Sequence, residues 1–167
     1  MTYYDFVKEY MNVDECKNNR KYSSAGHTFC WSKNNSTHAE GLYWFYEGDG
    51  FIIDVHDFYI REEVIQNSTY SMSDYVSIYS SYIVSANGEK FNPYQILTAN
   101  SLCTLDFDNI KDDFLFLLHE NCYYLAVSIG FKRELLDKHL SSINVDPESF
   151  YRALLQTNQI ILTKALE

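Results

Sequence analysis

The stretch GLYWFYEGDGFIIDVHDFYI, residues 41–60, decides the fold. Two runs rich in aromatic and β-branched residues, 41–46 and 51–60, flank the sequence EGDG at 47–50. Such residues favour strands, and a glycine-containing turn between two runs is typical of a β-hairpin. We therefore expect an antiparallel hairpin here and a mainly β fold around it.

Alternation along the two strands divides this hairpin into two faces. If Tyr46 pairs with Phe51, one face carries Leu42, Trp44, Tyr46, Phe51, Ile53 and Val55. The other face carries Tyr43, Phe45, Ile52, Asp54 and His56. The first face is nearly all apolar, which suits either the filled core of a barrel or, in a wide barrel, the wall of a ligand cavity. Both interpretations stay open, with Asp57 as a polar group that would orient a ligand.

The rest of the first 130 residues adds one helix and several strands. Apolar residues at helical spacing predict a short helix within residues 3–12. Residues 86–89 (ANGE) predict a second tight turn. The remaining candidate strands are residues 27–31, 74–85, 101–106, 114–119 and 122–130.

After Gly130 the apolar spacing changes to that of helices. One helix is expected around Phe131–Leu140, and Asp146-Pro147 supplies the N-cap and first position of another. On this second helix Phe150, Leu154, Thr157 and Ile161 form one stripe. The stripe suits a seam between two copies of the chain or packing of the helix on its own sheet, and both remain open.

Composition excludes several partners. The net charge is −10, and the four arginines (Arg20, Arg61, Arg133, Arg152) are scattered, so we do not expect this segment to bind DNA directly. No apolar run approaches the roughly 20 residues of a membrane helix. The four cysteines form no CxxC or CxxH spacing, which favours a reduced, cytoplasmic protein without structural zinc.

Catalytic motifs are sparse. Asp54 and His56 point to one side of a strand and precede Glu62 and Glu63, which partly matches the metal site of cupin enzymes. The usual H-x-H pair is missing, and the sequence has no G-x-S-x-G, P-loop or G-x-G-x-x-G motif. We therefore expect no catalytic residues, no metal and no cofactor.

Three segments together resemble a known family. They are GLYWFYEGDGFIIDVHDFYIREE (41–63), NGEKFNPYQIL (87–97) and YYLAVSIGFKRELLDKHL (123–140). Over roughly residues 30–165 the chain resembles the N-terminal cupin-like domain of AraC-family transcription regulators. The resemblance implies a jelly-roll β-barrel that binds a small effector, followed by two helices that dimerise. Two helix-turn-helix units would normally follow and would bind the DNA.

On this hypothesis the chain divides into an N-terminal arm (1–26), a sensing barrel (27–130) and a dimerisation segment (131–165). Leu166 and Glu167 are interpreted as a cloning remnant. The ligand-pocket residues are expected to be Trp44, Tyr46, Ile53, Asp57 and His56. The residues of a homodimer interface are expected to be Phe150, Leu154 and Ile161. A small metal-dependent cupin enzyme and a protein-interaction module without a ligand are the alternatives.

Overall fold

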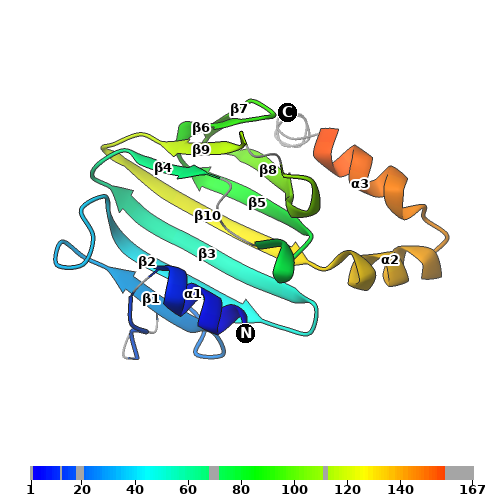
Figure 1. Cartoon of the computed structure of the whole chain (residues 1–167), viewed down its shortest axis with the longest axis horizontal. Helices are drawn as coiled ribbons and strands as arrows, with labels where there is room; N and C mark the ends of the chain where they lie inside the picture. Colours follow the sequence, from blue (N-terminus) through cyan, green and yellow to red (C-terminus); the bar gives the residue numbers. More distant parts are fainter. Residues whose placement is uncertain (1, 12, 18–20, 68–71, 111–112, 157–167) are drawn as a thin grey trace.

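The computed structural model describes residues 2–11, 13–17, 21–67, 72–110 and 113–156. Their strands form two sheets (Figure 1). The six-stranded sheet has, in spatial order, β1 (His27–Trp31), β2 (Ala39–Glu47), β3 (Phe51–Ile60), β10 (Cys122–Phe131), β5 (Ile78–Ser85) and β8 (Ser101–Asp106). The four-stranded sheet has β4 (Val64–Asn67), β9 (Leu115–Leu118), β6 (Asn87–Phe91) and β7 (Gln95–Thr98). The expectation of a mainly β chain is confirmed.

Eight of these strands pair in a nested order. β3 pairs with β10, β4 with β9, β5 with β8 and β6 with β7, each pair antiparallel. The pairs β3–β10 and β5–β8 belong to the larger sheet, and the pairs β4–β9 and β6–β7 belong to the smaller. The chain from β3 to β10 is therefore one long hairpin that alternates between the two sheets. In the larger sheet this order places β10 between β3 and β5.

The central hairpin forms as expected, with a shifted register. Tyr46 lies opposite Ile53 instead of Phe51, because Glu47 pairs with Ile52 and Gly48 donates its N–H to the Phe51 carbonyl over 2.8 Å. Gly50 has a φ of +83°, which a residue with a side chain rarely adopts. A shift of two residues preserves the faces, so the division into two faces is correct.

The turn expected at residues 86–89 is wrong. The chain leaves β5 at Ser85 and enters β6 at Asn87, so it passes between sheets. A Cβ on Gly88 would lie 2.1 Å from the Leu117 carbonyl oxygen of the neighbouring strand β9. Gly88 is therefore explained by the close approach of a backbone, which sequence alone does not distinguish from a turn.

Within the described residues, three α-helices and two short 3₁₀ helices accompany the sheets. The helices are α1 (Tyr3–Met11), α2 (Arg133–Ser142), α3 (Pro147–Gln156), η1 (Met72–Asp74) and η2 (Phe107–Asn109). α1 and both C-terminal helices confirm the sequence expectation. Asp146 caps α3 by accepting the Ser149 N–H over 3.1 Å. Tyr151 on α3 is buried, and its hydroxyl donates to Asp137 of α2 over 2.6 Å, so the two helices pack on each other.

Apolar side chains gather on both faces of the six-stranded sheet. α1 packs on the inner face, where Tyr3, Phe6 and Val7 join Phe45 and Ile52 in one cluster. A second inner cluster fills the space toward the four-stranded sheet around Ile83, Leu97 and Ala126. A small third cluster of Leu42, Trp44 and Val55 lies on the outer face. The inner face is thus the main interior.

Candidate ligand cavity

A cavity of about 550 Å³ lies on the inner face of the six-stranded sheet. Residues of β2, β3, β5, β8 and β10 form one wall, and residues of α1, β4 and β9 form others. Most of the lining is apolar, with aromatic rings from Tyr3, Phe6, Phe58, Phe107, Phe116 and Tyr124. A cavity of this size and lining suits a small molecule with a largely apolar body.

A buried carboxylate forms the centre of the polar part of the wall. Asp54, on β3, is 1% exposed. Its Oδ2 accepts hydrogen bonds from the Tyr43 hydroxyl over 2.8 Å and from the Tyr79 hydroxyl over 2.6 Å. Burial and the nearby carboxylate raise the pKa of both tyrosines well above 10, so both hydroxyls keep their protons and donate.

The hydrogen-bond chain extends to the N-terminal helix. The hydroxyls of Tyr3 and Tyr43 are 2.6 Å apart and buried. Because Tyr43 gives its only hydroxyl proton to Asp54, the Tyr3 hydroxyl donates to Tyr43. α1 is therefore joined to the carboxylate by a continuous chain from Tyr3 through Tyr43 to Asp54.

His56 lines the cavity beside Asp54. Its Nδ1 lies 3.7 Å from Asp54 Oδ1, which is beyond hydrogen-bond distance. Both atoms are buried, and neither has a hydrogen-bond partner among the described residues. Burial lowers the pKa of His56 although Asp54 opposes the shift, so the ring is neutral at pH 7.

One thiol also lines the cavity. Cys103, on β8, is buried, and burial raises its pKa to about 11 while Lys90 acts in the opposite direction. A thiol with so high a pKa is almost fully protonated at neutral pH and is a poor nucleophile. Cys103 therefore acts as a small apolar side chain in this wall.

Comparison with known proteins adds no family assignment: no protein-family model and no curated protein matches the chain. None of the helices in the described part has both the length and the apolar content to cross a membrane.

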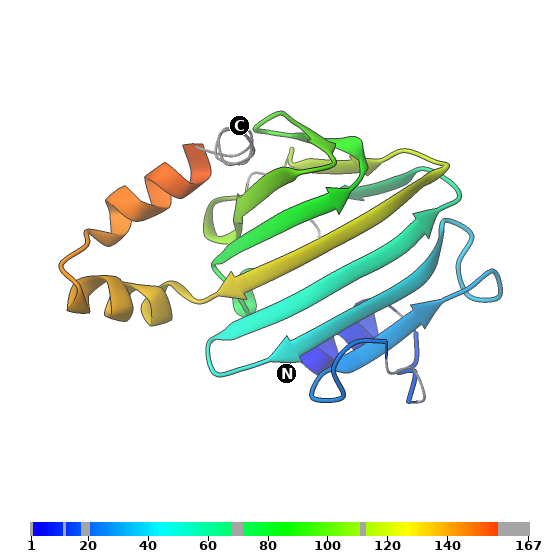
Figure 2. The same cartoon turned by 180° about the vertical axis from the view of Figure 1, so that it is seen from behind.

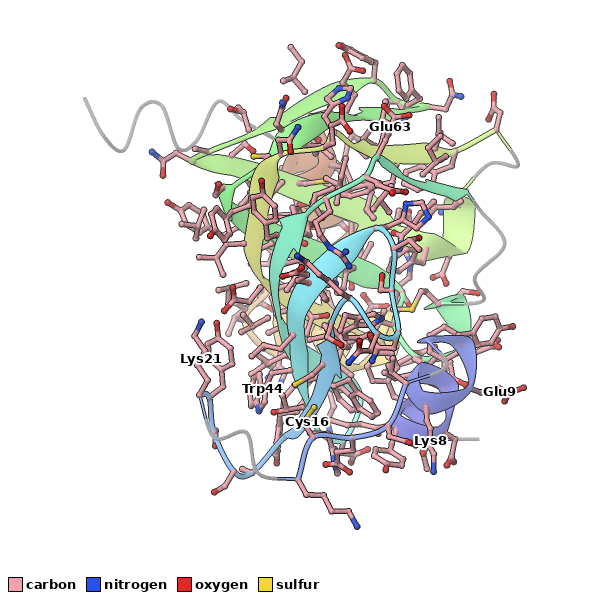
Figure 3. All side chains as sticks on the ribbon, turned by 90° about the vertical axis from the view of Figure 1, so that its left-hand side faces the viewer. Lys8, Glu9, Cys16, Lys21, Trp44 and Glu63 are labelled. Carbon is pink, nitrogen blue, oxygen red and sulfur yellow. The ribbon has the colours of Figure 1, made fainter. Side chains whose placement is uncertain are left out.

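The five residues expected in the pocket lie on opposite faces of the sheet. His56 lines the cavity. Trp44, Tyr46, Ile53 and Asp57 do not line it, because alternation places them on the outer face of β2 and β3. Figure 3 shows Trp44 on the same side of the sheet as Lys21, whereas Lys8 and Glu9 of α1 lie on the other side. The apolar face of the hairpin is thus the outer one.

The N-terminal arm explains why so apolar a face points outward. Trp44 is 9% exposed because Tyr22 packs beside it and its indole N–H donates to the Ser23 carbonyl over 2.8 Å. Asp57 accepts from Lys21 over 2.6 Å and from the Tyr22 hydroxyl over 2.8 Å. The arm therefore buries part of the outer face, a contact between distant segments that no local pattern indicates.

The residues of the partial cupin metal motif do not come together. Asp54 and His56 are neighbours, but Glu63 lies 3.5 Å from His119 Nδ1, in another part of the molecule. Within the described ranges, no group of three or more His, Cys, Asp or Glu side chains is arranged to hold a metal ion.

Sequence reasoning missed Tyr43, Asp54, Tyr79 and Tyr124 as cavity residues. Alternation already placed Tyr43 and Asp54 on the face of His56, and that shared face was the available signal. Tyr79 and Tyr124 come from β5 and β10, whose positions beside β3 depend on the nested pairing. No local sequence feature reveals them.

The expected interface residues lie on and beyond α3. Phe150 and Leu154 are half-buried in the single chain, and Tyr151, between them, makes the contact with α2. Ile161 lies outside the described residues. The use of Phe150 and Leu154 in a dimer stays a prediction.

Proposed function

We propose that this chain is an effector-binding domain that takes a small, mostly apolar molecule into its inner cavity. The observation that carries the proposal is the cavity of about 550 Å³ whose aromatic wall holds one buried polar cluster around Asp54 and His56. Ligand sites in proteins are typically apolar concavities with a few polar groups that fix orientation. A core selected only for stability would have no need of this cluster.

The polar cluster restricts the chemistry of the ligand. When neutral His56 carries its proton on Nδ1, the nitrogen that faces Asp54, its Nε2 is a hydrogen-bond acceptor. The adjacent carboxylate disfavours an anionic ligand group at this point. A hydroxyl or phenol on an apolar body fits both conditions. Sugars fit poorly, since a mainly apolar wall cannot satisfy their many hydroxyls.

The wider proposal is a cupin-like jelly roll serving as the sensing half of an AraC-type regulator in the cytoplasm. The nested pairing of the eight strands from β3 to β10 supports the jelly-roll part, since a jelly roll consists of eight strands in two sheets. The family resemblance over residues 41–63, 87–97 and 123–140 is the basis for the regulatory part. On this proposal the chain dimerises and reaches DNA only through helix-turn-helix units of the complete protein.

The N-terminal helix offers a route from ligand to regulation. Tyr3, Phe6 and Tyr10 of α1 line the cavity, and Tyr3 belongs to the hydrogen-bond chain of Asp54. A ligand that contacts these side chains would bind one position of α1 more tightly than another. Differential affinity of this kind is what allows an effector to shift a conformational equilibrium.

A matched pair of probes tests the proposed chemistry. We would measure the thermal unfolding temperature with 4-hexylphenol and with 4-hexylanisole, in which a methyl group replaces the hydroxyl proton. A ligand that binds the native state raises this temperature. We expect a larger rise with the phenol than with the anisole, and we expect His56→Ala to abolish that difference.

His139→Ala is the matched control, because His139 is exposed on α2 away from the cavity. This variant should respond to both probes as the unmodified chain does. If neither probe raises the unfolding temperature, or if His56→Ala responds like the control, the proposed site is wrong. The regulatory part has its own test: the native gene should continue past residue 165 into two helix-turn-helix patterns.

A further inference from the structure

The outer face of the larger sheet carries an exposed apolar patch. The patch consists of Tyr46, Ile53, Tyr82, Val84, Val127 and Ile129, each between 36% and 45% exposed. These residues come from β2, β3, β10 and β5, which are neighbours in the sheet. Figure 2 looks onto this face, and no helix of the described chain crosses these strands.

The strand register makes the patch continuous. One row of outward residues runs Tyr46, Ile53, Ile129 and Ser80 across the four strands. The next row runs Trp44, Val55, Val127 and Tyr82, of which Val127 and Tyr82 are exposed while Trp44 and Val55 are buried in the cluster with Tyr22. Neither row contains a charged residue, although 22% of the chain is charged. An uncharged strip of this kind on a monomer is a feature that usually marks an interface.

We propose that this patch is the contact surface for a second copy of the chain. The six side chains expose on the order of 400 Å² per copy when their exposed fractions are applied to typical side-chain areas. A standard interface buries about 800 Å² per partner, of which somewhat more than half is apolar, or roughly 450 Å². The apolar area of the patch therefore matches the requirement of one stable dimer.

Symmetry also favours a second copy as the occupant. The patch lies on antiparallel strands, and two such sheets pack face to face when their strands are nearly aligned. A two-fold axis through the middle of the patch would set the row of Ile53 and Ile129 of one copy against apolar residues of the other. The same surface then serves both copies, as an isologous interface requires.

The charge of the chain distinguishes this occupant from a basic partner. Each copy carries a net charge of −10, so two copies repel each other outside the uncharged patch. Added salt screens this repulsion and should strengthen the dimer. A basic protein held by attraction to the acidic chain would instead bind more weakly as salt increases.

The test is the oligomeric state of the full 167-residue chain. Sedimentation equilibrium from micromolar to near-millimolar concentration, at low and high salt, gives the dissociation constant of the dimer. Ile129→Glu places a charge in the patch and should raise that constant at least about tenfold. Ile65→Glu is the matched control, because Ile65 is 59% exposed on β4 of the other sheet and should leave the constant unchanged.

The remaining variants decide between the sheet patch and the interface expected at Phe150, Leu154 and Ile161. If Ile129→Glu fails to fold, as judged by circular dichroism, Tyr82→Glu on β5 makes the same test. Phe150→Ser should preserve the dimer if the sheet face carries it. A chain that stays monomeric, a dimer insensitive to both patch variants, a dimer lost only with Phe150→Ser, or a dimer weakened by salt would each overturn the proposal.

Discussion

Replacing either tyrosine that donates to Asp54 tests the buried hydrogen-bond chain. Tyr79→Phe removes one donor, and a hydrogen bond to a charged group contributes about 2 kcal/mol. Tyr43→Phe removes the equivalent donor and also leaves the buried Tyr3 hydroxyl without its acceptor. A buried donor left without an acceptor costs about 1–2 kcal/mol more. We therefore expect losses of about 2 kcal/mol for Tyr79→Phe and about 3.5 kcal/mol for Tyr43→Phe.

Urea unfolding at pH 7 measures both losses, and thermal unfolding should show decreases of about 6 °C and about 10 °C for a chain of this length. Tyr94→Phe is the control, because Tyr94 is 58% exposed and donates to Glu89 over 2.9 Å at the surface. That variant should stay within about 0.5 kcal/mol of the unmodified chain. Equal losses for the two buried tyrosines, or a loss at either that matches the control, would refute the direction assigned to the chain of donors.

Three further predictions concern stability. Burial lowers the pKa of His56, so as the pH falls through about 6.5 the unfolded chain takes up a proton more readily than the folded chain does. Stability should therefore fall as pH decreases through about 6.5, and urea titrations should show a shallower fall for His56→Asn. Asp146→Ala removes the cap on the Ser149 N–H and should cost about 1 kcal/mol in thermal unfolding. Gly41→Ala should cost at least about 2 kcal/mol in urea unfolding, because Gly41 has a φ of +140° and a Cβ there would lie 2.1 Å from the Asp57 carbonyl oxygen.

The larger sheet could be predicted from sequence because its strands are rich in aromatic and β-branched residues. The expected ranges 27–31 and 101–106 coincide with β1 and β8. The smaller sheet contains strands that carry weaker signals. β6 has the sequence NGEKF, and its buried positions are Gly88 and Lys90. Glycine normally indicates a turn and lysine an exposed surface. β4 and β7 were missed as well, because each has only four residues, too few for alternation to show, and lacks the continuous apolar run that marked β9.

Alternation identified the two faces of the central hairpin but not which of them is interior. The more apolar face was chosen, which is the usual rule for a strand with one buried side. The structure reverses the choice because two long-range effects act together. The arm covers Trp44 through Tyr22 and Ser23, and the inner face holds the carboxylate of Asp54 with tyrosine hydroxyls. A rule that assigns the more apolar face to the interior cannot predict an interior face that carries a charged residue such as Asp54.

That charged residue is also the strongest reason to look for function in the cavity. Replacing a buried charged cluster with apolar residues of similar volume is often neutral or stabilising, so stability alone does not explain Asp54. The tyrosines satisfy Oδ2, yet Oδ1 and the Nδ1 of His56 each lack a hydrogen-bond partner in the described part of the chain. Each buried polar atom in that state costs about 1–3 kcal/mol. Both unsatisfied atoms belong to residues that line the cavity, and we expect groups retained at such a cost to act on the molecule that occupies it.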